Sequence, residues 1–405
     1  MKILPYSTQK IDDSDISAVL SALKEPLLTK GNKVIEFEKQ LANYCGAKFA
    51  LAFNSATSAL KASYFAHNLQ NCAVLTSPIS FVATTNMLLE SGATPLFCDI
   101  GIDGNLSPND VEKCILNYPK NSTKPLRAIV SIDLGGKSVD ANALLNIAKK
   151  YNLSFISDSS HALGSYVDKK NRVGSIADST IFSFHPVKPI TTFEGGALLT
   201  NDKEIYKRAK LHREHGVTPL DPLTYDVSTI GYNFRLSEVG AALGLSQLQK
   251  LPNFLEIREE IASFYDAFFD NKFTKSHGTN WQKDTIHRIF GKRIFEERAV
   301  ASAPFMPLHL QNDLKSSNHL YQILLDPIFW DKKLEIHNEL KERGIMTQVH
   351  YRPIYQFSLY RTFNVKALHN AERFYKATLS IPCHHNMNKD DAHFVAKNLL
   401  EILHD

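Results

Sequence analysis

The chemistry of this sequence centres on one lysine near the end of a β-rich run. Lys188 closes the segment Ser183–Lys188, which begins within the run 180–184 and continues beyond it. A lysine in a loop at the carboxyl edge of a sheet can form a Schiff base with a carbonyl group, provided that its amine stays partly uncharged. Most lysines are surface residues, so Lys188 becomes a candidate only together with its neighbours.

A carboxylate and an imidazole follow the run 154–157. Asp158 comes directly after this run, and His161 lies one turn further on. A carboxylate there can hold a protonated ring nitrogen, because the two charges stabilise one another in a partly dry site. An aspartate at a strand end is more often a helix cap, so this interpretation also depends on its companions.

A third candidate is the segment Asn54–Leu60, which follows the run 49–53. It contains Ala56 and Thr57 within a series of small and hydroxyl residues. Such a series at the start of a helix presents free backbone N–H groups and the positive end of the helix dipole, which suits a phosphate. The alternative is an ordinary serine or threonine cap.

An aromatic residue completes the set. Phe81 follows Ser77–Ser80 at an expected loop-to-helix junction, where it can stack on a planar ring or pack in the core. A phosphate cradle, a carboxylate for a ring nitrogen, a Schiff-base lysine and a stacking aromatic are together what pyridoxal phosphate requires of a protein. The ordered combination therefore predicts that cofactor.

The elements that must position these residues read as alternating strands and helices. Most strand candidates are apolar almost throughout, which is typical of strands buried on both faces. Helical patterns such as 57–66 and 140–150 lie between them. The pattern predicts a doubly wound α/β fold with a mostly parallel sheet, and ligands bind beyond the carboxyl ends of such strands. The expected strands are 49–53, 73–76, 94–99, 127–133, 154–157, 180–184 and 197–200.

The remaining chain predicts a second, smaller α/β domain. A long helix over 236–269 is expected to bridge the two, and we place the large domain at 1–250 and the small C-terminal domain at 251–405. The stretch 271–317 matches no clear pattern and is expected to be an insertion. The elements expected after it are strands 319–325, 345–351 and 379–383 and helices 332–343 and 390–403.

Composition limits the class of protein. The chain has 405 residues, of which 43% are hydrophobic and 22% charged, so wholesale disorder is excluded. A net charge of +4 gives no reason to expect a nucleic-acid partner, and no apolar run reaches the ~18 residues of a membrane helix. Five scattered cysteines and an acidic N-terminal segment that does not resemble a signal peptide predict a cytoplasmic protein.

Several of these segments, taken in order, resemble the DegT-type sugar-nucleotide aminotransferases. The strings that carry the resemblance are FNSATSAL, PISFVATTNMLLESG, SDSSHALGS, FSFHPVKPITTFEGGALLTND and GYNFRLSEVGAALGLSQL. The resemblance runs from about Tyr6 to the C-terminal helix. It implies the aspartate-aminotransferase fold, that is, PLP fold type I, with pyridoxal 5'-phosphate as cofactor.

Within the family, the chain is most similar to the branch that acts in pseudaminic acid biosynthesis. The strings DSSHALG, QVHYRPIYQ and SIPCH fit that branch. The resemblance implies transfer of an amino group from L-glutamate, which leaves 2-oxoglutarate, to C4 of a UDP-linked 4-keto-6-deoxy-N-acetylhexosamine. Nucleotide, sugar configuration and amino donor rest on this resemblance alone.

The resemblance also assigns roles to individual residues. Lys188 matches the catalytic Schiff-base lysine and proton shuttle, and its presence favours transamination over the dehydration that a histidine there would imply. Asn233 matches a phosphate contact supplied by the neighbouring subunit, which implies a homodimer with a shared active site. The other cofactor-binding matches are Ala56, Thr57, Phe81, Asp158, His161 and Ser183, and the substrate-side matches are Tyr6, Pro26, Leu27, Leu28, Thr29, His350 and Tyr351.

Other interpretations stay open at this point. The string Leu134–Ser138 has part of a P-loop pattern but lacks its first glycine, since Ser131 stands there. The groups His212–His215 and Cys383–His385 contain metal-ligating residue types without a metal-site spacing. The remaining alternatives are a family member that acts on a different nucleotide-linked keto sugar and a regulator that binds the cofactor without turnover.

Overall fold

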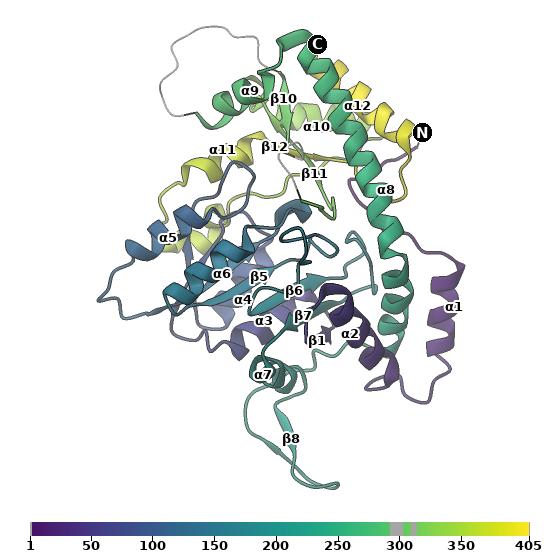
Figure 1. Cartoon of the computed structure of the whole chain (residues 1–405), viewed down its shortest axis with the longest axis vertical. Helices are drawn as coiled ribbons and strands as arrows, with labels where there is room; N and C mark the ends of the chain where they lie inside the picture. Colours follow the sequence, from purple (N-terminus) through teal and green to yellow (C-terminus); the bar gives the residue numbers. More distant parts are fainter. Residues whose placement is uncertain (1, 292–302, 309–313, 405) are drawn as a thin grey trace.

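The computed structural model describes residues 2–291, 303–308 and 314–404 (Figure 1). The helices are α1 (Asp13–Ala22), α2 (Asn32–Cys45), α3 (Ala56–Ala66), α4 (Val82–Glu90), α5 (Pro108–Leu116), α6 (Ala141–Lys150), α7 (Lys203–Arg213), α8 (Glu238–His277), α9 (Trp281–Phe290), α10 (Lys333–Glu342), α11 (His369–Ala377) and α12 (Lys389–His404). The strands are β1 (Phe49–Phe53), β2 (Ala73–Thr76), β3 (Thr94–Phe97), β4 (Leu126–Ile132), β5 (Ser154–Asp158), β6 (Ser179–Ser183), β7 (Gly196–Thr200), β8 (Val217–Pro219), β9 (Tyr225–Val227), β10 (Phe305–Pro307), β11 (Tyr321–Leu325) and β12 (Thr378–Ile381).

The large sheet has seven strands in the order β1-β7-β6-β5-β4-β2-β3. The pairs β2–β3, β2–β4, β4–β5 and β5–β6 are parallel, whereas β7 runs antiparallel to both of its neighbours. The predicted mostly parallel sheet is therefore confirmed. The carboxyl ends of β4, β5 and β6 meet at one edge, where the predicted site residues follow the strands.

The nearly continuous apolar strands bury both of their faces. Alternate residues of a strand point to opposite sides of a sheet. Ile129 and Phe155 accordingly belong to one buried cluster. Val130 and Ile156, their immediate neighbours, belong to another on the opposite side. This double burial explains why the strands show no polar alternation and why helices cover both faces.

A single helix connects the two parts of the chain. The helix α8 has 40 residues with Pro252 inside it, and it runs along one side of the molecule from the large sheet to the small one (Figure 1). The small sheet is antiparallel in the order β10-β11-β12. The proposed domain boundary after residue 250 thus falls within α8.

Two expectations for the C-terminal part need revision. The expected strand over 345–351 is wrong, because this segment makes only the isolated bridges Leu4–Ile345 and Gln348–Ser380. Pro353 follows it and cannot donate a ladder hydrogen bond. In the expected insertion 271–317, the described residues include α9 and β10, which pairs with β11 in the small sheet. Residues 292–302 and 309–313 of that stretch lie outside the described residues.

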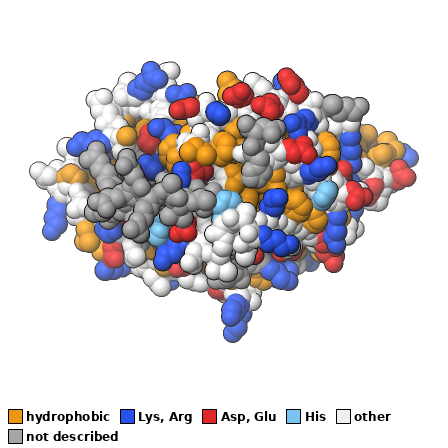
Figure 2. Space-filling model, turned by 90° about the horizontal axis from the view of Figure 1, so that it is seen from above, with side chains coloured by type: hydrophobic (Ala, Val, Ile, Leu, Met, Phe, Trp, Pro, Cys, Tyr) orange, Lys and Arg blue, Asp and Glu red, His pale blue; other side chains and the backbone are white. Residues whose placement is uncertain are grey.

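The N-terminal segment packs on the C-terminal part, and Lys2 pairs with Asp391 in the first turn of α12 (Figure 1). Leu4 N–H donates to Gly344 O at 2.8 Å, which carries Tyr6 towards His350. No helix in the described part of the chain is long and apolar enough to cross a membrane. Basic and acidic side chains are interspersed over the face seen in Figure 2. This face therefore carries no large patch of a single charge sign.

Candidate active site

A cavity of about 580 Å³ lies at the carboxyl edge of the large sheet. Its walls come from the ends of β5 and β6, the starts of α3 and α4, and the segment 348–352. The structure therefore gathers in one place residues that are up to 351 positions apart, from Tyr6 to Phe357. The predicted site residues that line the cavity are Tyr6, Ala56, Thr57, Phe81, Asp158, His161, Ser183, Lys188, His350 and Tyr351.

The start of α3 forms an anion cradle. Ser55 is the N-cap, and its side chain accepts a hydrogen bond from Ser58 N–H at 3.1 Å. The backbone N–H groups of Ala56 and Thr57 have no acceptor among the described residues, as is usual in a first helical turn. They face a cavity, and the helix dipole adds positive potential, so the cradle fits a phosphate group.

A glycine allows the cradle to sit against the sheet. A Cβ at Gly196 would lie 2.6 Å from Ala56 Cα, too close for any side chain. Gly196 opens β7, which is next to β1 in the sheet, and β1 leads into α3. The glycine pair after Lys188 is therefore more than a turn signal, because it lets the strand backbone approach the start of α3.

Asp158 is held by side chains from two other positions. Thr84 Oγ1 donates to Asp158 Oδ2 at 2.6 Å, and Ser160 Oγ donates to Asp158 Oδ1 at 2.6 Å. The carboxylate is 7% exposed and lines the cavity. Two hydroxyl donors and a wall position fix the carboxylate for a cationic ring nitrogen, which fits the predicted cofactor.

His161 is buried between a backbone amide and a phenol. Gly135 N–H donates to its Nδ1 at 3.2 Å, and its Nε2 lies 3.1 Å from Tyr351 Oη. Burial, together with the nearby Lys188 and His350, holds the pKa of His161 well below its usual range. The imidazole is therefore neutral near pH 7.

Lys188 lines the cavity beside Asp158 without a fixed partner. A turn positions it, because its backbone N–H donates to His185 O at 2.8 Å. Its ammonium group makes no hydrogen bond or ion pair with the described residues. Burial lowers the pKa of Lys188 to about 8, while the charge of Asp158 acts to raise it. About a tenth of the amine is therefore uncharged at pH 7, and the uncharged amine is the form that acts as a nucleophile.

Aromatic rings form the outer wall of the cavity. The Phe81 ring is 60% exposed and lies 6.2 Å from the Tyr351 ring, and the Tyr6 ring lies 5.2 Å from that of His350. His350 is anchored by Ser380 Oγ, 2.8 Å from its Nδ1. Burial, followed by the charge of Lys188, lowers the pKa of His350 to about 3. An exposed aromatic at the mouth of a cavity can stack on a flat ring.

Some of the predicted site residues lie away from the cavity in a single chain. Asn233 is exposed, and its carbonyl accepts from Asn54 Nδ2 at 3.4 Å. The segment 26–29 is also exposed, and Leu28 O accepts from Glu238 N–H. Neither Asn233 nor this segment lines the cavity.

Sequence reasoning missed several residues of the site. Thr84 and Gly135, which hold Asp158 and His161, lie in other segments, and no local pattern marks them as partners of those two residues. Ser160 carried a signal, since a serine two residues after an aspartate often forms a side-chain turn. Glu194 and Arg352 also line the cavity. Arg352 is an exposed guanidinium that donates to Gln356 and lies over the Phe357 ring.

The P-loop interpretation is wrong. Leu134–Gly136 forms a short 3-10 turn, and Lys137 pairs with Asp103 at 3.3 Å. A P-loop would present its backbone N–H groups to a phosphate, whereas Gly135 N–H is used by His161.

The two groups of metal-ligating residue types serve in packing. His212 stacks on Phe65 at 4.3 Å, and Arg213 pairs with Glu38 at 2.6 Å. His385 stacks on Phe254 at 4.2 Å. Within the described ranges, no group of three or more His, Cys, Asp or Glu side chains is placed to hold a metal ion.

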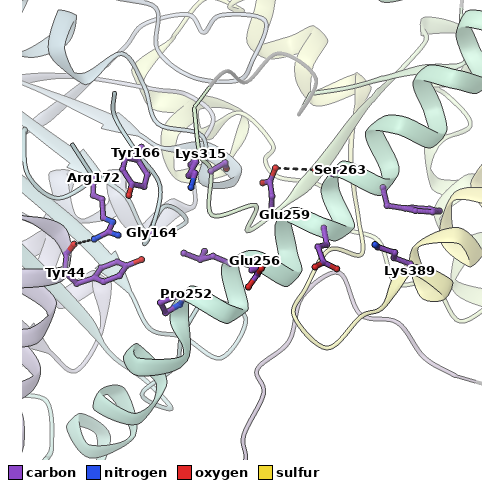
Figure 3. Close-up of a pocket in the computed structure, with 14 residues that line it drawn as sticks. Tyr44, Gly164, Tyr166, Arg172, Pro252, Glu256, Glu259, Ser263, Lys315 and Lys389 are labelled. Carbon is purple, nitrogen blue, oxygen red and sulfur yellow. Dashed lines mark hydrogen bonds between the residues drawn. The ribbon is translucent and has the colours of Figure 1, made fainter. Parts of the chain in front are cut away.

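A larger cavity of about 860 Å³ lies along α8 (Figure 3). Arg172 lies over the Tyr44 ring there, and Glu256 and Glu259 line the cavity from the helix. None of the predicted site residues lines this cavity. Size alone therefore does not identify the chemical site.

Known proteins share both the sequence and the fold of the chain. The profile of the DegT/DnrJ/EryC1/StrS aminotransferase family matches residues 9–400. The UDP-4-amino-4,6-dideoxy-N-acetyl-beta-L-altrosamine transaminase of Campylobacter jejuni strain 81-176 is 46% identical over 402 residues, which is 99% of this chain and 98% of the relative. The transaminase of the same name from Helicobacter pylori is 44% identical over 406 residues, again with 99% and 98% covered.

Solved structures agree with this relationship. Helicobacter pylori PseC, an aminotransferase involved in the biosynthesis of pseudoaminic acid, superposes with a TM-score of 0.86 at 42% identity, and each chain is fully covered (100%). The Spr1654 protein of Streptococcus pneumoniae in its PLP form has a TM-score of 0.84 at 25% identity, with 99% of each chain covered.

Proposed function

Because the chain belongs to the DegT/DnrJ/EryC1/StrS aminotransferase family, we propose that it aminates C4 of a UDP-linked 4-keto-6-deoxy-N-acetylhexosamine in pseudaminic acid biosynthesis. The observation that carries the proposal is one cavity that combines Lys188, Asp158 and the open start of α3. Full-length identity of 44–46% to transaminases of this named specificity supports the sugar.

The residues present fit pyridoxal 5'-phosphate, the cofactor of this family. When bound, the cofactor supplies an electrophilic carbonyl carbon and a ring that accepts electrons. We assign its phosphate to Ala56, Thr57 and Ser183, its ring nitrogen to Asp158 and one ring face to Phe81. The chemistry of these residues supports the assignment, because backbone N–H groups without an acceptor among the described residues, a carboxylate and an amine line the same cavity.

Lys188 acts twice in the proposed reaction. Its uncharged Nζ would hold the cofactor as the nucleophile, and the freed amine would then move a proton at the α carbon of the amino donor. Asp158, held by Thr84 and Ser160, would bind the protonated ring nitrogen. L-glutamate is the proposed donor, and 2-oxoglutarate leaves before the keto sugar enters, so the kinetics are ping-pong.

We propose that the working unit is a homodimer with shared sites. Asn233 and the segment 26–29 are exposed and outside the cavity, although the resemblance gives them cofactor and substrate roles. Large apolar side chains near them are exposed, including Leu27 at 58% and Ile230 at 75%. The hairpin β8–β9 projects away from the large sheet and carries Leu223, which is 92% exposed (Figure 1). A second copy would cover these side chains and bring Asn233 to the partner's cavity.

Subunit mixing tests the shared site. Lys188→Ala and Asn233→Ala proteins should each be inactive alone, because each lacks part of every site. Mixed dimers would contain one intact site, so equal mixing after reversible dissociation should recover about a quarter of the wild-type activity. No recovery from dimers shown to have exchanged would contradict a shared site.

A cytoplasmic location is part of the proposal. All five cysteines are free, and Cys45, Cys72, Cys98 and Cys383 are buried. Reduced thiols are typical of a reducing compartment.

The first experiment is a visible absorption spectrum of the purified protein before and after addition of L-glutamate. A cofactor band that converts with glutamate supports the aminotransferase, whereas a bound cofactor that converts with no amino donor favours the non-catalytic regulator. Subsequent assays with UDP-linked and dTDP-linked 4-keto sugars separate the proposed substrate from the alternative, a family member with another nucleotide-linked keto sugar. Preference for the dTDP sugar would contradict the substrate assignment.

A further inference from the structure

The backbone amide of Gly135 fixes the protonation of His161. Its N–H donates to His161 Nδ1 at 3.2 Å, so Nδ1 carries a lone pair and no proton. An imidazole with an unprotonated Nδ1 is neutral and carries its proton on Nε2. The tautomer thus follows from a backbone donor that cannot reverse its role.

The groups around His161 agree with a neutral ring. The centroid of the His161 ring lies 4.5 Å from that of His319 and 6.4 Å from that of His350. Lys188 is close enough to lower the pKa of His161. Burial is the largest cause of the lowered pKa of His161, and the nearby Lys188 and His350 side chains lower it further. A proton added to His161 would also break the bond from Gly135.

The tautomer decides the role of the Tyr351 hydroxyl. His161 Nε2–H must donate to Tyr351 Oη, which lies 3.1 Å away. The phenol proton therefore points elsewhere, and among the described residues no second group receives it. Burial is the largest cause that raises the pKa of Tyr351, so the phenol keeps its proton. Since Tyr351 lines the cavity, its O–H is available to a ligand.

Other residues fix both ends of the hydrogen-bonded series Gly135–His161–Tyr351. Gly135 has φ +67°, and a Cβ there would lie 2.9 Å from Gln322 Oε1, so a side chain would disturb the turn. Gln322 Nε2 donates to His350 O at 3.1 Å, which fixes the backbone directly before Tyr351. The donor amide and the phenol are therefore both held by groups outside the cavity.

We propose that Tyr351 is the hydrogen-bond donor to an oxygen atom of the bound ligand, and that His161 is the positioning residue that directs the phenol proton into the cavity. The inference rests on the proposed function and refines it, since the resemblance places His161 itself near the cofactor's 3-hydroxyl. Both nitrogens of His161 are already engaged by Gly135 and Tyr351. The oxygen acceptor can belong to the cofactor ring or to a substrate.

Tyr351→Phe separates the two sources and is compared with Tyr355→Phe. Tyr355 donates to Glu372 at 2.8 Å and does not line the cavity, so it controls for loss of a phenol. If the acceptor is the ring oxygen, its anion loses a donor, and the pH midpoint of the cofactor's visible band should rise by about one to two units. If the acceptor belongs to a substrate, the midpoint should stay and kcat/KM for that substrate should fall about 10- to 100-fold. No change in either quantity relative to Tyr355→Phe would overturn the proposal.

A double variant tests the positioning role. His161→Leu should change the same quantity as Tyr351→Phe, and it should add nothing in the Tyr351→Phe background, because both act through one hydroxyl. An additive effect would mean that His161 contacts the ligand directly and would overturn its positioning role. His161→Gln, which keeps an N–H donor, covers the case in which His161→Leu fails to fold. A wild-type protein without a cofactor band would instead contradict the proposed function itself.

Discussion

Thr84 Oγ1 donates a hydrogen bond to Asp158 Oδ2 at 2.6 Å, although 74 positions separate the two residues. Thr84 is fully buried in α4, and Asp158 ends β5. The first turn of α4 therefore holds the carboxylate that we assign to the cofactor's ring nitrogen. Because a buried carboxylate without its donors is costly, this contact links cofactor affinity to a residue that the cofactor does not touch.

Thr84→Val should weaken cofactor binding. Valine keeps the shape of threonine and removes the donor to Asp158, so we expect the cofactor Kd to rise about 10- to 100-fold, as for the loss of a hydrogen bond to a charged group. Titration of the apoprotein measures this Kd. Thr84→Ser keeps a hydroxyl and should restore most of the affinity, and equal losses in the two variants would contradict the hydrogen-bond explanation.

Lys188 should set the pH dependence of cofactor incorporation. Its pKa is lowered by burial to about 8, and only the uncharged amine is a nucleophile. The rate constant for uptake should therefore rise about tenfold per pH unit below pH 8 and level off above it. Stopped-flow absorbance between pH 6 and 10 measures the profile. Lys188→Ala should retain the far-UV spectrum and lose turnover, and near-normal activity in that variant would refute the scheme.

Gly196→Ala should damage the phosphate cradle. The added Cβ would lie 2.6 Å from Ala56 Cα, so β7 and the start of α3 must separate. We expect a loss of about 1–3 kcal/mol in stability from the overpacking. We also expect a larger loss of affinity for inorganic phosphate or the cofactor than Gly278→Ala causes. Gly278 has open space around it, but its φ is +81°, so it controls for the strain of an added Cβ. Unchanged cofactor affinity in Gly196→Ala would contradict the cradle.

The protein should lose stability as the pH falls from about 6.5 to 4. Burial lowers the pKa of His212 and His384 to about 4 and that of His350 to about 3. Over this range the unfolded chain binds protons that the folded chain does not, so the free energy of unfolding falls as the pH falls, by up to about 1.4 kcal/mol per unit for each histidine. Urea unfolding at pH 7.5, 6 and 5 measures the slope. His384→Gln should reduce it, whereas His393→Gln at an exposed position should not, and equal slopes in both variants would contradict this origin.

The sequence by itself determined the large sheet and most of the residues gathered at its edge. Strands such as 154–157 were recognisable because double burial leaves an unbroken apolar run, and β5 ends at Asp158 within one residue of the prediction. The carboxyl ends of parallel strands meet at one edge of a sheet. Asp158 and Lys188 each lie at or after the end of a predicted strand, so the sequence alone predicts that they are close together. Small residues at the start of α3 marked the cradle, since a helix start has a local signature.

The tertiary structure decided which groups hold these residues. Thr84 reaches Asp158 and Gly135 reaches His161 across loops whose course depends on packing between distant segments. The segment 345–351 reads locally as a strand, yet it bends into the cavity because Gln322, Ser380 and Leu4 bind its backbone and side chains. Local patterns carry no information about such partners, because hydrogen bonds between side chains depend on position in space and not on spacing along the chain.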